Sequence, residues 1–235
     1  MKHDHSEIYK SALTCLQERG VPFVVGGAFA VYHYTDIWRD THDIDIFTTP
    51  ENVPQAVAAL SAEGFKDLGE QAAGDRGWIY HGIKEDIIVD VIWQFANRIA
   101  MVEQSWIDGA EEGPFLSLQV FFPPIENLVW SKMFTLNRHR CDWPDVMNII
   151  RLNCERFNWQ CLLNMLGEHW LLFAGLINVF DWQYPADYDC IPKWLRDELV
   201  LRREEYAPDR NQPSRVALLD PWIHTREEDI CKLEQ

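Results

Sequence analysis

Three aspartates are the residues of this chain whose types and spacing best suit a chemical reaction. Asp43 and Asp45 lie in DIDIF (43–47), where acidic and apolar residues alternate; this pattern predicts a strand whose two acids share one face. Asp90 lies in DIIVDVIW (86–93), an almost wholly apolar run typical of a strand buried on both faces. Because an unpaired charge inside such a strand is costly, we expect Asp90 to lie beside the other two acids.

A divalent cation would relieve the repulsion among carboxylates held close together. Neighbouring carboxylates raise one another's pKa, and a set of ligands that are all oxygen suits Mg²⁺ or Mn²⁺ better than Zn²⁺. A site with two such metals can bind the acceptor oxygen and the leaving side of a phosphate. We therefore predict that Asp43, Asp45 and Asp90 bind metal, and that an acceptor attacks the α-phosphorus of a nucleoside triphosphate in line at this site. Asp90 would be the base, and pyrophosphate would leave.

Four residues that precede the acidic strand in the sequence are candidates for binding the phosphates. Gly26 and Gly27 separate a short apolar segment from a predicted helix. Backbone N–H groups at a helix start can meet phosphate oxygens, and glycine allows the closest approach. Arg39 and Thr41 stand just before Asp43 and could contact phosphates or hold the loop.

Each of these features also has a simpler structural explanation. A Gly-Gly pair is usually a turn, Asp-x-Asp at a strand edge is usually solvated surface, and one acid in an apolar strand is often an ion-pair partner. Their occurrence together and in this order favours a functional site. Because 44 residues separate Asp45 from Asp90, Asp86 at the edge of the later strand is the alternative third acid. His81 could lie near the acceptor, although a structural histidine is the commoner case.

One segment, VVGGAFAVYHYTDIWRDTHDIDIF (24–47), resembles the signature of the DNA polymerase beta-like nucleotidyltransferase superfamily. That signature is Gly-Gly, a helix, Asp-x-Asp between apolar residues, and a third acid on a later strand. The matching positions are Gly26, Gly27, Asp43, Asp45 and Asp90. The spacing of Arg39 and Thr41 is similar to that in minimal bacterial members and in lincosamide-type antibiotic nucleotidyltransferases.

A second resemblance to this superfamily lies in PPIENLVWSKMFTLNRHRCDWPDV (123–146), since many members carry a helix with Lys and Arg followed by Asp-x-x-Asp. The matching positions are Lys132, Arg138, Asp142 and Asp145. In the superfamily the Lys usually points toward the nucleotide phosphates, so the resemblance implies that Lys132 and Arg138 bind nucleotide. The alternatives are structural: a solvated Lys132, a basic cluster that favours a helix C-terminus, and acids that cap and begin the next helix.

The arrangement of apolar residues predicts an α/β (α+β) fold in which a mixed sheet with flanking helices is followed by a helical C-terminal half. The resemblance implies that this sheet is of the nucleotidyltransferase type. We place the catalytic domain at residues 1–123, a helical domain at 124–206 and a polar, Pro-rich tail at 207–235. With 47% hydrophobic residues and 11 Trp, the chain has enough apolar material for a sizeable core.

The net charge and the cysteines indicate which classes of partner and which cellular location to expect. The net charge of −16 disfavours binding to nucleic acid and to anionic lipid surfaces. The six scattered cysteines include no CxxC pair, so we expect reduced thiols and a cytoplasmic location. No apolar window reaches the roughly 18 residues that a membrane span needs, and we expect 170–179 to be a buried helix.

The sequence thus predicts a Mg²⁺- or Mn²⁺-dependent nucleotidyltransferase that transfers a nucleoside monophosphate from a nucleoside triphosphate, expected to be ATP, to a small-molecule or protein acceptor. Two alternatives stay open: a catalytically inactive protein of this fold that binds nucleotide or a partner, and a component of a toxin–antitoxin pair. An oligomer is compatible with the sequence. The pattern identifies neither the acceptor nor the base of the nucleotide.

Overall fold

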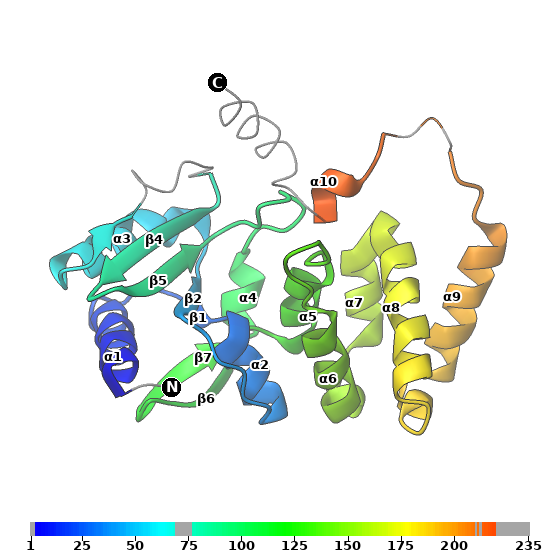
Figure 1. Ribbon diagram of the computed structural model, residues 1–235, viewed down its shortest axis with the longest axis horizontal. Coiled ribbons are helices and arrows are strands. Elements are labelled where there is room, and N and C mark those ends of the chain that lie inside the picture. The colour runs from blue at the N-terminus through cyan, green and yellow to red at the C-terminus, as the bar shows by residue number, and fades with distance from the viewer. Residues whose placement is uncertain (1–2, 69–76, 210, 212, 220–235) are drawn as a thin grey trace. The chain divides into compact units, whose positions relative to one another are not determined.

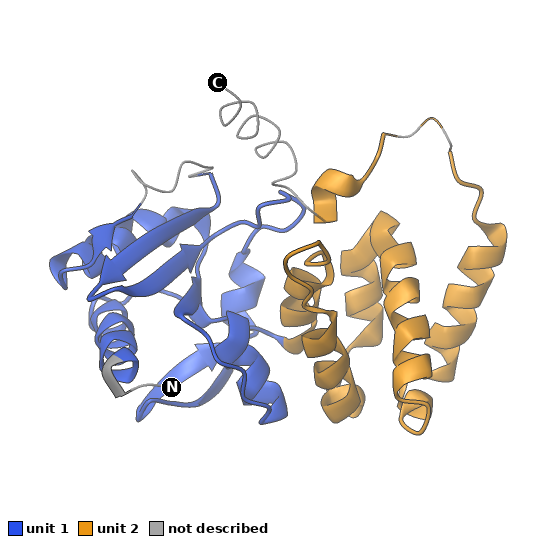
Figure 2. Ribbon diagram, in the orientation of Figure 1, with its two compact units in different colours: residues 1–124 blue, residues 125–235 orange. Residues whose placement is uncertain are grey.

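The computed structural model describes residues 3–68, 77–209, 211 and 213–219, and Figure 1 labels its helices and strands. The chain forms two compact units, residues 1–124 and 125–235, which Figure 2 colours separately. The polar tail predicted for 207–235 lies mostly outside the described residues; the helix described within it is α10 (Val216–Leu219).

Unit 1 is built on a mixed five-stranded sheet in the order β1-β2-β5-β4-β3. β2 and β5 are parallel, and the other neighbouring pairs are antiparallel. The strands are β1 (Val24–Val25), β2 (Asp43–Phe47), β3 (Lys66–Asp67), β4 (Ile79–Lys84) and β5 (Ile87–Ile92). The predicted α/β fold with a mixed sheet is confirmed, and both acidic segments are strands of that sheet.

Helices and a β-hairpin complete unit 1. They are α1 (His3–Glu18), α2 (Gly27–Thr35), η1 (Pro50–Asn52), α3 (Val53–Ala62), α4 (Gln104–Asp108) and the hairpin of β6 (Glu111–Phe115) and β7 (Leu118–Phe122). α1 and α3 pack on each other, and both contact β5 (Figure 1). The two helices thus fix the strand that carries Asp90.

Alternation along β2 and β5 separates an apolar face from an acidic one. The residues that alternate with the acids are fully buried: Ile44, Ile46, Val89 and Val91. Successive side chains of a strand point to opposite faces, so Asp43, Asp45 and Asp90 leave from the other face of the sheet. Burial of apolar surface stabilises a fold by roughly 25 cal/mol per Å². Burial of the apolar face therefore fixes the two strands, and with them the positions of the three acids.

Unit 2 is helical, as the sequence predicts for this half. Its elements, besides α10, are α5 (Ile125–Met133), α6 (Trp143–Asn153), η2 (Cys154–Arg156), α7 (Trp159–Leu166), η3 (Gly167–His169), α8 (Trp170–Gln183), η4 (Tyr188–Cys190) and α9 (Lys193–Glu205). α5 packs on α6 and α7, and α8 packs on α6, α7 and α9.

One helical stretch of unit 2 has the length and composition of a membrane span, contrary to the sequence expectation. Among the residues described, Trp159–Gln183 runs for 25 residues and contains an 18-residue window with a mean hydropathy of 1.3. It is divided into α7 and α8 near Gly167, whose φ is +49°. Leu163 and Phe173, on either side of this break, are buried, and 39% of the apolar window is buried within the structure. The absence of a membrane partner therefore stays a prediction.

Two of the six cysteines are joined, so the prediction of reduced thiols is wrong for them. Cys154 of η2 and Cys190 of η4 form a disulfide across 36 residues of sequence, with their Cα atoms 5.8 Å apart. Helix packing brings the two 3₁₀ turns together, which the spacing of cysteines could not show. Cys15, Cys141 and Cys161 are free, and Cys231 lies outside the described residues. The cytoplasmic location stays a prediction.

Candidate active site

Strand register assembles a row of three polar side chains across the sheet. The parallel pairing of β2 and β5 places Asp45 opposite Asp90. The antiparallel pairing of β4 and β5 places His81 opposite Asp90 on its other side. Opposed residues of neighbouring strands point to the same face, so His81, Asp90 and Asp45 stand side by side. Asp43 shares their face, two residues before Asp45.

The alternative third acid does not join this row. Asp86 lies exposed in the turn between β4 and β5, with φ of +63°, and β5 begins only at Ile87. The structure therefore favours Asp90 as the third carboxylate of the face.

Asp90 and His81 are directly bonded within the row. Nδ1 of His81 lies 2.7 Å from Oδ1 of Asp90, whose side chain is 11% exposed. Burial raises the pKa of Asp90, the bond to His81 opposes that rise, and the charge of Asp43 adds to it. The same bond raises the pKa of His81. The sequence left His81 open between a place near the acceptor and a structural role, because its position opposite Asp90 depends on a register that the sequence does not reveal.

Gly27 gives the Asp45 carboxylate its place. The backbone of Gly27 has φ of +54°, and a Cβ there would lie 1.8 Å from Oδ2 of Asp45. Glycine is required on both counts, since other residues avoid this conformation and would collide with the carboxylate. Gly27 is also the first residue of α2, so the carboxylate lies at the positive end of a helix dipole, which stabilises its charge.

Gly26 packs against the same strand. Its N–H donates a hydrogen bond to the carbonyl oxygen of Asp45 over 2.8 Å, and a Cβ at Gly26 would lie 2.4 Å from the ring of Phe47. The Gly-Gly pair is therefore explained by its contact with β2. Its contact with phosphate stays a prediction.

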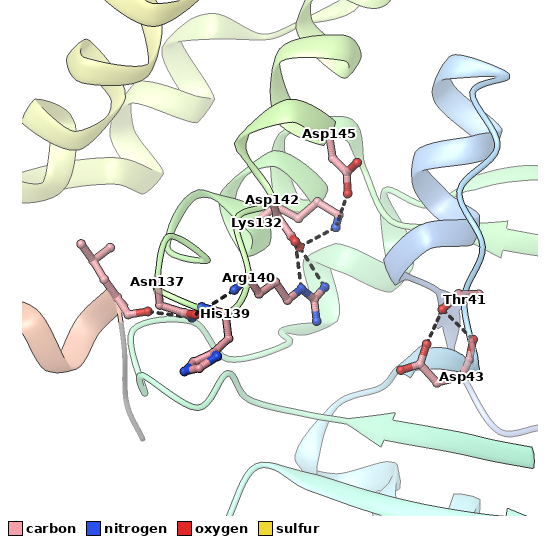
Figure 3. Close-up of polar contacts among 9 residues, drawn as sticks. Thr41, Asp43, Lys132, Asn137, His139, Arg140, Asp142 and Asp145 are labelled. Atoms are coloured by element: carbon pink, nitrogen blue, oxygen red, sulfur yellow. Dashed lines mark hydrogen bonds and ion pairs between the residues drawn. The ribbon is translucent and has the colours of Figure 1, made fainter. Parts of the chain in front are cut away.

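Thr41 uses its hydroxyl to hold Asp43. The Oγ1 of Thr41 donates to Oδ1 of Asp43 (Figure 3), which agrees with the loop-holding alternative for this residue. Arg39 is exposed on the segment that leads into β2.

Tyr9 places a buried hydroxyl within the influence of the three acids. It lies on α1 and is fully buried, yet its hydroxyl has no hydrogen-bond partner in the described structure. Burial raises its pKa well above the usual range, and the charges of Asp43, Asp45 and Asp90 raise it further. The signal of Tyr9 in the sequence is a polar atom on the buried side of an amphipathic helix.

The donors on this face suit a hard cation. Three carboxylates supply oxygen ligands of the kind that Mg²⁺ and Mn²⁺ prefer. Across the part of the chain that is described, however, no three His, Cys, Asp or Glu side chains are grouped as ligands of one ion. Asp43 is bonded to Thr41 and Asp90 to His81. The three-acid metal centre stays a prediction.

The chain was compared with protein families and with curated sequences. Residues 5–132 match the family described as nucleotidyl transferase of unknown function (DUF2204). This chain belongs to that nucleotidyltransferase family. The match spans the Gly-Gly pair and all three carboxylates, so the resemblance predicted from those residues is confirmed. No curated protein sequence matches the chain.

Solved structures show that the fold of this DUF2204 nucleotidyltransferase is shared. The solution structure of the antibiotic-resistance factor ANT(2'')-Ia has 17% identity and a TM-score of 0.52, and covers 75% of this chain and 96% of its own. The crystal structure of ANT(2'')-Ia in complex with adenylyl-2''-tobramycin has 18% identity and a TM-score of 0.51, and the match covers 74% of this chain and 98% of the ANT(2'')-Ia chain. At this identity the likeness concerns the fold.

In unit 2, Lys132 is buried in a cluster of ions. Its Nζ lies 2.8 Å from Oδ2 of Asp142 and 3.0 Å from Oδ2 of Asp145, and Arg140 binds both oxygens of Asp142 over 2.8 and 2.9 Å (Figure 3). Lys132 is 4% exposed, so the alternative of a solvated lysine is wrong. Its charge is committed to two carboxylates of its own unit. Arg138 lies exposed between α5 and α6.

The structural alternative for Asp142 and Asp145, as the cap and the first turn of the next helix, holds only in part. Asp142 occupies the N-cap of α6 but makes no capping bond, because its carboxylate binds Lys132 and Arg140 instead. Burial alone would raise the pKa of Asp142, but these two cations outweigh it and hold the pKa at about 2. Asp145 lies in the first turn of α6, as predicted.

Replacing Gly27 with alanine should disrupt the acidic face. We expect Gly27→Ala to lower the free energy of unfolding by about 2 kcal/mol or more, since it adds a collision with Asp45 to the left-handed backbone penalty. Gly20→Ala is the matched control, because Gly20 has φ of +64° with no atom within 4 Å of a built Cβ. Urea unfolding would measure both; equal losses would contradict the Asp45 contact.

The stability of the metal-free protein should fall as the pH rises through the raised pKa of His81. A group whose pKa is raised by folding contributes stability fully below its ordinary pKa, and that contribution is lost as the pH passes the raised value. For His81 the loss starts near 6.5. Urea unfolding between about pH 6 and 9 should show a decrease that is smaller in His81→Asn. An identical decrease in both proteins would argue against the assignment.

Removing the Lys132 charge should destabilise unit 2. We expect Lys132→Met to cost about 3 kcal/mol, at the lower end for a broken buried pair because Arg140 still binds Asp142. The control is Lys193→Met, which removes an exposed ion pair with Asp197 and should change stability by less than about 0.5 kcal/mol. If denaturant unfolding shows a similarly small effect for Lys132→Met, the structural role of Lys132 is wrong.

Proposed function

We propose that this protein is a Mg²⁺- or Mn²⁺-dependent enzyme that transfers a nucleoside monophosphate from ATP, or another nucleoside triphosphate, to a small-molecule or protein acceptor. The observation that supports it most is the row of His81, Asp90 and Asp45 on one sheet face. The row occurs in a chain that belongs to a nucleotidyltransferase family.

In the proposed reaction an acceptor oxygen or nitrogen forms a bond to the α-phosphorus. The bond from that phosphorus to the bridging oxygen breaks, and its electron pair leaves with pyrophosphate. The acceptor's proton passes to Asp90. The raised pKa of Asp90 strengthens it as a proton acceptor, and the bond from His81 to Oδ1 orients its carboxylate while leaving Oδ2 for the proton.

Asp43 and Asp45 are the proposed metal ligands. A divalent cation bound there would neutralise charge on the triphosphate. Thr41 restrains the carboxylate of Asp43, and Gly27 allows that of Asp45 to lie against the start of α2. Both acids are thus positioned by contacts within unit 1.

The phosphate ligands are proposed with unequal support. Gly26 and Gly27 lie where α2 begins, and a helix N-terminus favours anions. Arg39 is an exposed cation of unit 1, suited to phosphate contact. The nucleotide contact predicted for Arg138, in unit 2, stays a prediction. Lys132 would have to leave two carboxylates to bind phosphate, so we propose a structural role for it in place of the predicted one.

For the acceptor we favour a small molecule that is neutral or cationic. A net charge of −16 repels nucleic acid and other polyanions. The ANT(2'')-Ia complex contains adenylyl-2''-tobramycin, a nucleotidylated small molecule, at 18% identity to this chain. That likeness supports a small-molecule acceptor as a class and identifies no particular compound.

The partner of Asp90 bears on the inactive alternative. A buried Asp90 paired with a permanent Arg or Lys would favour a protein that does no chemistry. Its partner is His81, which can lose its charge, so Asp90 is not permanently neutralised. The carboxylates are not grouped as one metal site in the described residues, and cation binding is therefore the step to test.

Thermal unfolding with Mg²⁺ and each of the four nucleoside triphosphates tests the proposal. At about a hundredfold excess over Kd, the preferred nucleotide should raise Tm by roughly 5–10 °C. Asp45→Asn should abolish the shift, because a metal ligand is lost. The matched control is Asp86→Asn, an exposed acid outside the row, which should leave the shift intact.

Two results would count against the proposal in different ways. A wild-type protein that no triphosphate stabilises has no donor site, and the proposal fails. A protein that binds triphosphate but releases no pyrophosphate with any of a panel of hydroxyl and amine acceptors supports the inactive alternative.

A further inference from the structure

The order of the strands gives the two substrates of the proposed reaction different sides of Asp90. β5 lies between β2 and β4 in the sheet, so Asp90 has Asp45 on one side and His81 on the other. The metal and the triphosphate are proposed at Asp43 and Asp45, on the β2 side. An acceptor whose proton passes to Asp90 must lie within hydrogen-bond reach of that carboxylate. The β4 side of Asp90 is therefore the side left for the acceptor.

On that side, His81 has one ring nitrogen that the described chain does not bind. Its Nδ1 is bonded to Oδ1 of Asp90, whereas its Nε2 has no hydrogen-bond partner among the described residues and is not buried. The side chain of His81 is 30% exposed, against 11% for Asp90. The two nitrogens point in different directions from the imidazole ring, and each can bind a separate partner. Nε2 is therefore accessible to a molecule that reaches Asp90 from solvent.

Two isoleucines next to His81 provide an apolar surface. Ile83 lies two residues after His81 on β4, and the register pairs it with Ile88 of β5. Ile88 is in turn opposite Asp43 of β2. Residues that are opposed, or two apart on one strand, share a face, so both isoleucines lie on the face of the three acids. Each is only partly buried, which leaves apolar surface accessible beside Asp90.

The helices of this unit that pack on β4 and β5 cover the other face. Lys84 alternates with Ile83, and its Nζ donates to the carbonyl oxygen of Glu63, at the end of α3, over 2.9 Å. The same Nζ lies 3.4 Å from the hydroxyl of Ser11 on α1. α1 packs on β5, and α3 packs on both strands. The face that carries His81 and Ile83 is thus the one that α1 and α3 leave uncovered.

We infer that His81 binds the acceptor: its Nε2 forms a hydrogen bond to the acceptor, and Ile83 and Ile88 pack on an apolar part of the same molecule. This inference rests on the proposed function, because it assumes that Asp90 takes a proton from an acceptor. The class that fits is a small molecule with an apolar face and a hydroxyl in addition to the group that reacts. A hydroxyl suits Nε2 in either protonation state of the ring, because it both donates and accepts.

His81→Asn separates the acceptor contact from the bond to Asp90. The Nδ2 of asparagine takes the place of the histidine Nδ1 and keeps a donor for Asp90, whereas nothing replaces Nε2. We would measure pyrophosphate release from ATP and Mn²⁺ with the probe acceptors glycerol, myo-inositol, ethanolamine and glucosamine. For the probe that the wild type uses best, His81→Asn should raise KM roughly five- to tenfold, the value of one hydrogen bond. Its kcat and its KM for ATP should change less than about twofold, because uniform binding is lost.

Tyr80→Phe is the matched control, because Tyr80 is the neighbour of His81 on β4 and alternation places its side chain on the face of α1 and α3. This variant should leave KM unchanged for the probe and for ATP. Calorimetry with Mn²⁺ and α,β-methylene-ATP gives a readout besides activity. The Kd should be the same in the wild type, His81→Asn and Tyr80→Phe, because none of these residues is a proposed ligand of the metal or the phosphates.

The outcomes separate this inference from the proposed function. If the wild type does not bind the analogue, or releases no pyrophosphate with any probe, the proposed function fails and the inference fails with it. If the wild type transfers nucleotide and His81→Asn keeps the same KM for the probe, only the inference is overturned. A loss of kcat in His81→Asn with the KM for the probe unchanged would show that His81 acts through Asp90 alone, and would also overturn it.

Discussion

The repulsion among three carboxylates on one sheet face is the constraint on which this structure depends. The register of β2 and β5 brings Asp45 opposite Asp90, and the pleat adds Asp43 to the same face. Each of the three carboxylates has a different contact. The start of α2 lies against Asp45, His81 bonds Asp90, and Thr41 bonds Asp43. These contacts stabilise the negative charges of the three carboxylates, whose oxygens remain on one face of the sheet as candidate metal ligands.

Much of the fold and part of the site could be predicted from local sequence. The alternation in 43–47 and the apolar run in 86–93 identify two strands, and the mixed sheet follows from their setting among helical segments. Asp90 could be expected to join Asp43 and Asp45 because a lone buried charge is costly. These inferences depend on periodicity and burial, which neighbouring residues determine.

The rest depends on contacts between distant segments, which local sequence does not specify. His81 belongs to the row through the pairing of β4 with β5, and the role of Gly27 depends on the position of one carboxylate. Lys132 resembles a nucleotide ligand in sequence, but two acids further along the chain neutralise it. Cys154 and Cys190 meet only because the helices of unit 2 pack as they do. In each case tertiary context decides among roles that the residue type leaves open.

The central claim is that Asp43 and Asp45 bind a divalent cation, and crystals soaked in Mn²⁺ test it most directly. An anomalous difference map at the manganese absorption edge should show a peak about 2.1 Å from carboxylate oxygens of both residues, the distance typical of small hard cations. The peak should be absent from crystals of Asp45→Asn. A map from well-occupied crystals with no peak on this face, or with manganese bound elsewhere on the protein, would contradict the account.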